Sequence, residues 1–279
     1  MKILLVPTDF SHEAGAGVEY AATLANTGDF KILLLHAFDL SLADVLYTRI
    51  VPATHSFKDA AHDGLASTKD LISRKTKAKI ECLFEEGTLM DAIHKTVNEQ
   101  QPDYIIMGTR GAKGLKKLFG GSKTSQIIRK AQCPVISIPE KATFKGLKKV
   151  CFASGFHRDD IEELRSVVEL VRPYQGIIKV VHAAKPDEDR IEQVMYAFEK
   201  NIRKQISNSH FDFEVIQGMQ LQETLERYLD SEQPDLFAIS TRKRQSIERI
   251  AGPGISESLS LECRYPILIF HQATPPLIF

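Results

Sequence analysis

A glycine-rich stretch with hydroxyl and basic side chains is the part of this sequence best suited to chemistry. It runs from Met107 to Thr124, follows an apolar run and leads into a helical pattern, so it predicts a strand, a loop and a helix start. Its five glycines let the backbone approach a ligand closely, because they carry no Cβ atoms. A helix start has unpaired N–H groups and roughly half a positive elementary charge, which favours phosphate. Ser122 and Thr124 are suitable N-cap residues whose hydroxyls can also donate to an anion.

The spacing of these glycines is more specific than their number. Gly108 is followed after two residues by Gly111, and after nine more by Gly121 and Ser122, which is the nucleotide-binding pattern G-2x-G-9x-G-[S/T]. Positive charge around the loop comes from Lys113, Lys116, Lys117 and Lys123. The alternative, a surface loop with a solvated basic face, stays open, because a glycine pattern alone is a weak signal.

This pattern resembles the ATP-binding branch of the universal stress protein family. Two further segments share the resemblance: the opening run Lys2–Ser11, and Cys133–Pro139, which looks like the closing strand of that family. The resemblance implies ATP as the ligand, allows Mg²⁺ to accompany it, and implies an adenine nucleotide alpha hydrolase-like, Rossmann-like fold. It carries the family's nucleotide contacts over to Pro7, Thr8, Asp9, Ala37, Met107, Gly108, Arg110, Gly111, Gly114, Gly121, Ser122, Lys123 and Thr124.

Several of these positions allow more than one interpretation. Asp9 follows the first strand, where open α/β sheets place ligands, and the resemblance puts it near the ribose and phosphates, often beside a metal ion. Asp is equally natural as a helix N-cap, and both roles are compatible. The resemblance gives Ala37 a backbone contact with adenine, whereas Arg110 could pair with a phosphate or remain a solvated side chain. His36 and His182 recur at matched strand ends and are interpreted as structural.

Strands and helices alternate along the first half of the chain. Lys2–Val6 is a continuous apolar run, typical of a strand buried on both faces of a parallel sheet. Further strands are expected at Lys31–Phe38, Ile80–Phe84, Tyr104–Met107 and Val135–Ile138, and helices at Glu13–Thr27, Lys58–Ala78, Met90–Gln100 and Ser125–Ala131. Residues 39–56 are less regular and are expected to form a loop with a short helix. The alternation implies right-handed crossovers and an α/β fold with a doubly wound parallel sheet.

The second half of the chain repeats the first, and the sequence turns polar between them near residues 139–145. The repeat is visible where residues 148–156, 180–183, 232–235 and 265–269 overlay the opening strand and residues 34–37, 100–103 and 133–137. We therefore predict two tandem domains, residues 1–142 with the intact loop and residues 143–279 with a degenerate one.

The second domain differs from the first at the motif positions. It has Ser240, Lys243, Pro253 and Gly254 in the loop and Gly155 opposite Asp9. Pro253 removes a backbone N–H donor where a phosphate would sit, so we expect nucleotide in the first domain only. Gly252 and Gly254 with Ser256 could still form an anion seat, so the loss need not be complete.

The closing strands of the two domains predict how the chain assembles. Val135–Ile138 and Ile267–Phe270 are apolar and come last in their domains, and strands at a sheet edge invite pairing. In dimeric relatives the closing strands of two subunits meet, so the resemblance implies an intramolecular pseudo-dimer with pseudo-two-fold symmetry. A further homodimer stays open.

Composition argues against several classes of partner. The 36 Lys and Arg residues equal the 36 Asp and Glu residues, so the whole molecule offers no bulk attraction to nucleic acid or to an anionic membrane. No stretch approaches the ~18 apolar residues of a membrane helix, and the short run Ile3–Val6 does not suit a signal peptide. The four cysteines are far apart and suit reduced thiols, with no metal site. We expect a cytoplasmic protein.

The sequence shows no recognisable catalytic set. It contains neither the phosphate-loop pattern GxxxxGK[ST] nor the metalloprotease pattern HExxH. Bound ATP should therefore turn over slowly at most, because phosphoryl transfer depends on positioning and charge stabilisation. We expect a stress-response nucleotide-binding module. Two alternatives stay open: an ATP-dependent phosphotransferase or nucleotidyltransferase that uses Asp9 and Lys123, and a ligand-free protein-interaction member of the family.

Overall fold

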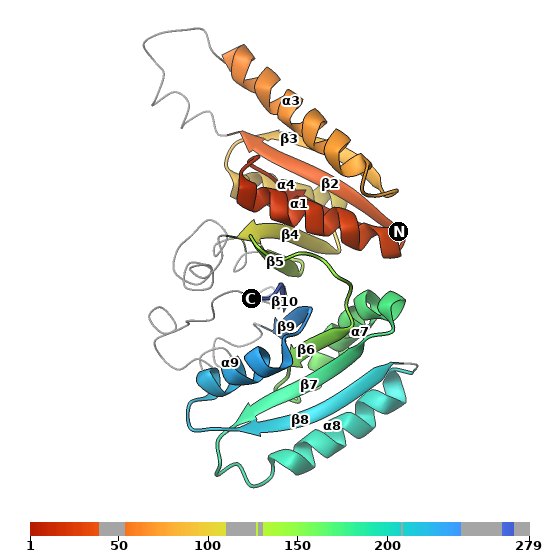
Figure 1. Cartoon of the computed structure of the whole chain (residues 1–279), viewed down its shortest axis with the longest axis vertical. Coiled ribbons are helices and arrows are strands. Elements are labelled where there is room, and N and C mark those ends of the chain that lie inside the picture. The colour runs from red at the N-terminus through yellow and green to blue at the C-terminus, as the bar shows by residue number, and fades with distance from the viewer. Residues whose placement is uncertain (39–53, 110–126, 128–130, 208, 241–263, 271–279) are drawn as a thin grey trace, which may run out of the picture. The chain divides into compact units, whose positions relative to one another are not determined.

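The computed structural model describes residues 1–38, 54–109, 127, 131–207, 209–240 and 264–270 (Figure 1). These residues divide into two compact units: unit 1 contains the described residues 1–109 and 131–144, and unit 2 contains Ile127 and the described residues from Lys145 onward. The predicted glycine loop between Arg110 and Thr124 lies outside the described residues, as do residues 39–53, so their expected conformations stay predictions.

Unit 1 contains five strands and the helices between them among its described residues. In chain order they are β1 (Lys2–Pro7), α1 (His12–Leu24), the short helix η1 (Ala25–Thr27), β2 (Phe30–Phe38), α3 (Thr54–Ser73), β3 (Lys79–Glu86), α4 (Leu89–Gln100), β4 (Tyr104–Thr109) and β5 (Val135–Pro139). The strands are ordered β3-β2-β1-β4-β5, and each neighbouring pair is parallel.

The apolar strands of unit 1 form the middle layer of its core. Leu4 and Leu5 of β1 and residues 32–35 of β2 are fully buried, as expected for strands covered on both faces. α1 and α3 pack beside one another on one face of this sheet, and α4 lies on the other face (Figure 1). The predicted α/β fold with a doubly wound parallel sheet is confirmed.

Unit 2 repeats this plan. Its elements are β6 (Lys149–Ala153), α7 (Asp160–Val171), η2 (Arg172–Tyr174), β7 (Ile177–Ala184), α8 (Ile191–Gln205), β8 (His210–Gln217), α9 (Leu221–Glu232), β9 (Leu236–Ser240) and β10 (Ile267–Phe270). The strand order β10-β9-β6-β7-β8 is parallel throughout and matches that of unit 1 strand for strand. α7 and α8 lie on one face of the sheet and α9 on the other (Figure 1).

Equivalent aspartates make the same hydrogen bond in the two sheets. Asp103 Oδ2 accepts a hydrogen bond from the Ile3 amide at 2.7 Å, and Asp235 Oδ2 accepts one from the Lys149 amide at 2.9 Å. In each unit, therefore, the aspartate before the fourth strand of the unit is bonded to the start of the first strand. The repeat seen in the sequence is a repeat of structure.

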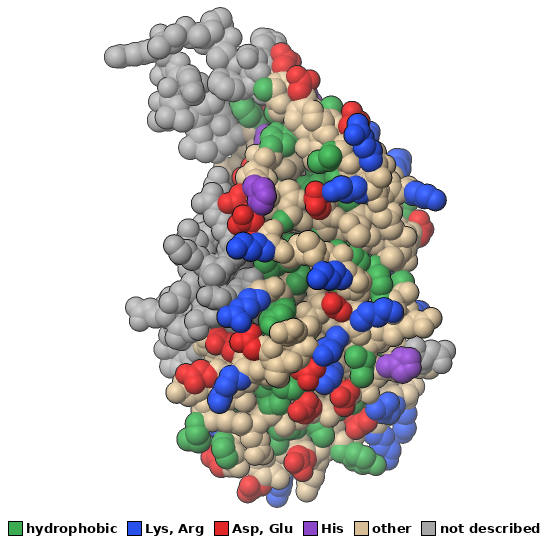
Figure 2. Space-filling model, in the orientation of Figure 1, with side chains coloured by type: hydrophobic (Ala, Val, Ile, Leu, Met, Phe, Trp, Pro, Cys, Tyr) green, Lys and Arg blue, Asp and Glu red, His purple; other side chains and the backbone are tan. Residues whose placement is uncertain are grey.

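The visible surface carries charges of both signs. Figure 2 shows acidic and basic side chains interspersed over the described part of this face, in keeping with equal numbers of each along the chain. Among the described residues, no helix is both long and apolar enough to span a membrane.

Candidate functional site

The strand order of unit 1 reverses between β1 and β4. In open parallel sheets, ligands bind outside the carboxyl ends of the strands at such a reversal. The structure brings several predicted residues to this place. Pro7 ends β1, and Thr8 and Asp9 follow it. Met107 and Gly108 lie near the end of β4, and Ala37 lies near the end of β2. Arg110, Gly111, Gly114, Gly121, Ser122, Lys123 and Thr124 are outside the described residues.

The loop after β1 is held by its own hydrogen bonds. The Thr8 amide donates to Leu35 O of β2 at 2.8 Å, and the Thr8 hydroxyl accepts from the Phe10 amide at 3.1 Å. Ser11 Oγ accepts from the Ala14 amide and so caps α1. Asp9 is not the N-cap: its side chain is exposed, and Oδ1 accepts from the Ser11 amide at 3.0 Å. Its carboxylate therefore remains at the edge of the sheet, where it can meet a ligand.

Phe10 and His36 form a stacked pair beside Asp9 that the sequence analysis did not predict. Phe10 has a left-handed backbone (φ 62°), and its ring stacks on the His36 ring with centroids 4.5 Å apart. His36 Nδ1 lies 2.8 Å from the carbonyl oxygen of Thr8. The tip of the Phe10 ring lies against α3, where a Cβ added at Gly64 would be 2.8 Å away. The one sequence signal for this arrangement was the recurrence of both residue types in the second half.

Gly108 is required by packing, in addition to any contact with a ligand. A Cβ added there would lie 1.6 Å from the carbonyl oxygen of Glu13 in α1. A Cβ added at Gly17 would lie 2.6 Å from the Gly108 amide nitrogen. The first glycine of the motif therefore lets α1 approach β4 closely, a reason that the glycine spacing did not reveal.

Unit 2 fills the corresponding loop with a carboxylate of its own. Asp160, in the first turn of α7, accepts hydrogen bonds from the Ser154 hydroxyl at 2.6 Å and from the amides of Gly155 and His157 at 3.0 and 3.2 Å. Asp160 is 3% exposed, and the position equivalent to it in α1 is Ala14. Three hydrogen-bond donors of this loop are thus bonded to one side chain of unit 2.

A second buried carboxyl group lies close by in unit 2. Glu163 is 5% exposed, and its Oε1 accepts from the Ser240 hydroxyl at 2.9 Å. Burial raises the pKa of Glu163 to about 8, with the Ser240 hydrogen bond opposing the shift and Asp160 adding to it. Glu163 and Ser240 stand where unit 1 has Gly17 and Gly108. The contact between helix and strand is thus made by backbone in unit 1 and by side chains in unit 2.

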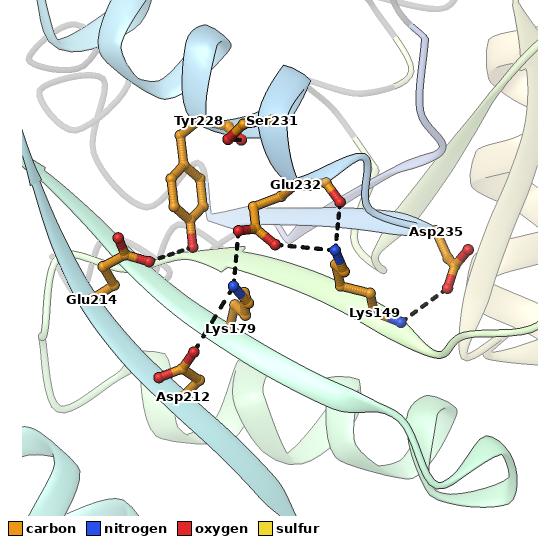
Figure 3. A network of polar contacts seen from close by, with 8 residues as sticks. All are labelled: Lys149, Lys179, Asp212, Glu214, Tyr228, Ser231, Glu232 and Asp235. Atoms are coloured by element: carbon orange, nitrogen blue, oxygen red, sulfur yellow. Dashed lines mark hydrogen bonds and ion pairs between the residues drawn. The ribbon is translucent and has the colours of Figure 1, made fainter.

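A polar network on the α9 face of unit 2 is a second cluster of titratable groups. It comprises Lys149, Lys179, Asp212, Glu214, Tyr228, Ser231, Glu232 and Asp235 (Figure 3). At its centre Lys179 Nζ bonds to Glu232 Oε1 at 2.8 Å, and Lys149 Nζ lies 3.2 Å from Glu232 Oε2. These contacts join the end of α9 to strands β6 and β7. We interpret the network as structural, because its central charges are paired with one another.

Cys133 and Cys151 are buried. Burial raises the pKa of both Cys133 and Cys151 to about 12, so these thiols stay protonated and unreactive at neutral pH. Among the described residues, no group of three or more His, Cys, Asp or Glu side chains could hold a metal ion. Mg²⁺ commonly combines one or two protein carboxylates with phosphate oxygens of a bound nucleotide, and the exposed Asp9 suits such a site.

Comparison with known proteins gives a consistent result. The model of the universal stress protein family matches residues 1–139. A universal stress protein A-like protein of Arabidopsis thaliana is 29% identical over 131 residues, which are 42% of this chain and 71% of that protein. A universal stress protein of Methanocaldococcus jannaschii is 26% identical over 144 residues, which are 49% of this chain and 81% of its own length.

Solved structures match along nearly the whole chain. The crystal structure of a universal stress protein from Archaeoglobus fulgidus covers 97% of this chain and 98% of its own, with a TM-score of 0.72 at 18% identity. A universal stress protein structure from Pseudomonas aeruginosa covers 97% of this chain and 93% of its own, with a TM-score of 0.59 at 15% identity. At these identities the likeness shows the fold.

Proposed function

The chain belongs to the universal stress protein family, and from this premise we propose that it is a cytoplasmic stress-response module that binds an adenine nucleotide, ATP, in unit 1. The site lies at the carboxyl ends of β2, β1 and β4 and continues into the glycine loop that follows Thr109. At most slow ATP hydrolysis accompanies binding.

The position of Asp9 and Gly108 is the observation that carries this proposal. Both lie at the reversal of strand order in unit 1, on the two sides of the place where open parallel sheets bind ligands. The nucleotide pattern therefore begins where a phosphate-binding loop is needed. Unit 2 lacks this arrangement, because Gly155 stands opposite Asp9 and Asp160 takes the hydrogen-bond donors of the loop after β6.

Each proposed residue has a definite role. Asp9 would lie near the ribose and phosphates, and it would supply a carboxylate oxygen to Mg²⁺ if the ion accompanied ATP. Pro7, Thr8 and Met107 shape the floor of the site, and the Ala37 backbone contacts adenine. The phosphates lie on the loop formed by Gly108, Arg110, Gly111, Gly114, Gly121, Ser122, Lys123 and Thr124.

Thermal unfolding with ATP tests this proposal. ATP at ~100 times its Kd adds about 2.7 kcal/mol to the stability of the protein that binds it, so Tm rises. Gly121→Val and Ser122→Glu should abolish the rise, because they fill or charge the phosphate seat. Gly254→Glu, in the loop of the second half, is the matched control and should leave the rise intact. An undiminished rise in both unit 1 variants would remove the loop from the site.

A further inference from the structure

We propose that His36 is a positioning residue of the nucleotide site, which holds the loop after β1 so that Asp9 faces the ligand. The inference rests on the proposed function and assigns a role to a side chain that the sequence analysis interpreted as structural. Three features of the structure carry it: a hydrogen bond, a ring contact and a comparison between the two units.

The hydrogen bond fixes one peptide plane. His36 Nδ1 is 2.8 Å from the Thr8 carbonyl oxygen, which can only accept, so the Nδ1 proton is the one donated. The carbonyl of Thr8 and the amide of Asp9 belong to the same planar peptide unit. Because the Thr8 amide also donates to Leu35 O at 2.8 Å, β2 holds this part of the loop at two points. The direction in which Asp9 leaves the sheet is thereby set.

The ring contact fixes the residue on the other side of Asp9. Phe10 has a left-handed conformation that side-chain-bearing residues rarely adopt. Its ring is stacked on His36 at 4.5 Å with 19° between the planes, and its tip meets the backbone of α3 at Gly64. Asp9 is therefore held between Thr8 and Phe10, and His36 contacts both of them.

Unit 2 contains the same histidine hydrogen bond and ring stacking, but without the acidic residue. His182 Nδ1 is 2.7 Å from Ser154 O, and the Phe156 ring stacks on His182 at 5.0 Å. Phe156 also has a left-handed backbone, with φ 56°. The residue between them is Gly155, which has no carboxylate to place. The histidine contact is thus a common part of the scaffold, and only in unit 1 does it aim a side chain that can meet a ligand.

Three substitutions separate positioning from simple stabilisation. His36→Phe keeps an aromatic ring for Phe10 but loses the donor to Thr8 O. His36→Asn loses the ring but keeps an N–H donor near the place of Nδ1. His182→Phe makes in unit 2 the change that His36→Phe makes in unit 1, and so reports the purely structural cost.

ATP affinity by calorimetry and Tm without ligand are measured for the intact chain. We expect His36→Phe to weaken ATP binding roughly tenfold, the effect of losing one hydrogen bond that orients the site. His36→Asn should bind ATP more tightly than His36→Phe, and His182→Phe should bind like the wild type. Both His→Phe variants should lower Tm to a similar extent.

A fourth variant gives an answer that does not depend on the folding of the histidine variants. Gly64→Ala favours the helix α3 but pushes a Cβ against the tip of the Phe10 ring. It should weaken ATP binding without lowering Tm. Wild-type affinity for ATP in Gly64→Ala and in any folded His36→Phe protein would overturn this inference and leave the proposed function intact. A wild-type protein that binds no ATP would overturn the proposed function, and the inference with it.

Discussion

Gly108 is needed both for the glycine pattern of the proposed nucleotide loop and for the packing of α1 on β4. The glycine pattern places it in a nucleotide loop, while the structure places its α-carbon against the backbone of α1. A side chain at this point would meet the carbonyl oxygen of Glu13, and backbone cannot move aside as a flexible side chain can. Loss of ATP binding in a Gly108 variant would therefore say nothing by itself about contact with the nucleotide.

The packing role of Gly108 can be tested without ligand. Gly108→Ala should lower the free energy of unfolding by about 2 kcal/mol or more, because overpacking against backbone forces α1 and β4 apart. Gly15→Ala in α1 is the matched control. A Cβ at Gly15 meets nothing within 4 Å, so this variant should be stabilised by up to about 1 kcal/mol through helix propensity. Urea denaturation measures both, and equal stabilities would refute the close contact.

For single residues, the sequence predicts positions that depend on neighbouring residues in the chain, and it does not predict contacts between distant segments. Asp9 could be placed at a strand end, since an apolar run stops just before it. The stacking of Phe10 on His36 joins the loop after β1 to β2, and the contact of Gly108 with α1 joins a strand to a helix far away in the sequence. Neither has a local pattern, and the recurrence of His36 as His182 was interpreted as structural without its partner being identified.

At the scale of elements, alternating strands and helices were predictable because each buried strand is a continuous apolar run. Among the strands, the prediction was least accurate for β3. β3 comes first in the strand order of unit 1 and extends over Lys79–Glu86, beyond the predicted Ile80–Phe84. Its ends are polar, and among the described residues it has one neighbouring strand, β2. The helix expected at Lys58–Ala78 ends as α3 at Ser73, where the amides of Lys75 and Thr76 both turn back to Ile72 O.

The network beneath α9 predicts a pH dependence of stability. The hydrogen bond from Lys179, helped by Lys149, lowers the pKa of Glu232. A carboxyl group whose folded pKa is lowered contributes stability above its unfolded pKa of about 4.3, and this is lost as pH falls through the lower folded value. Glu232→Gln should therefore cost about 1 kcal/mol at pH 7, since partly exposed pairs are screened.

Chemical denaturation at pH 7 and at acid pH measures this effect. The difference between Glu232→Gln and the wild type should shrink as pH falls below about 4. Glu192→Gln, at an exposed position of α8, is the control and should follow the wild type throughout. A deficit of Glu232→Gln that stayed constant with pH would show that charge pairing is not what Glu232 contributes.

At the scale of the whole molecule, the repeat predicts how the chain is assembled. We propose residues 1–142 and 143–279 as its domains, packed as a pseudo-dimer through the closing strands Val135–Ile138 and Ile267–Phe270. The ground is the apolar sequence of these strands and the tendency of strand edges to pair. Further homodimers are compatible with this arrangement.

Expression of residues 1–142 alone tests the packing. The isolated half should self-associate or be much less soluble than the full chain, because it exposes the surface that its partner half covers. Its mass in solution is the measurement, with the full chain as reference. A stable, soluble monomer that still binds ATP would refute the packing and leave the nucleotide site intact.

The central claim is that one ATP binds per chain, in unit 1. Calorimetric titration of the intact protein with ATP tests it most directly. Because Gly155 stands opposite Asp9 and Pro253 removes a donor from the loop of the second half, we predict a single site per chain, which disappears in Ser122→Glu and persists in Gly254→Glu. Two equal sites, or no binding at all, would contradict the account.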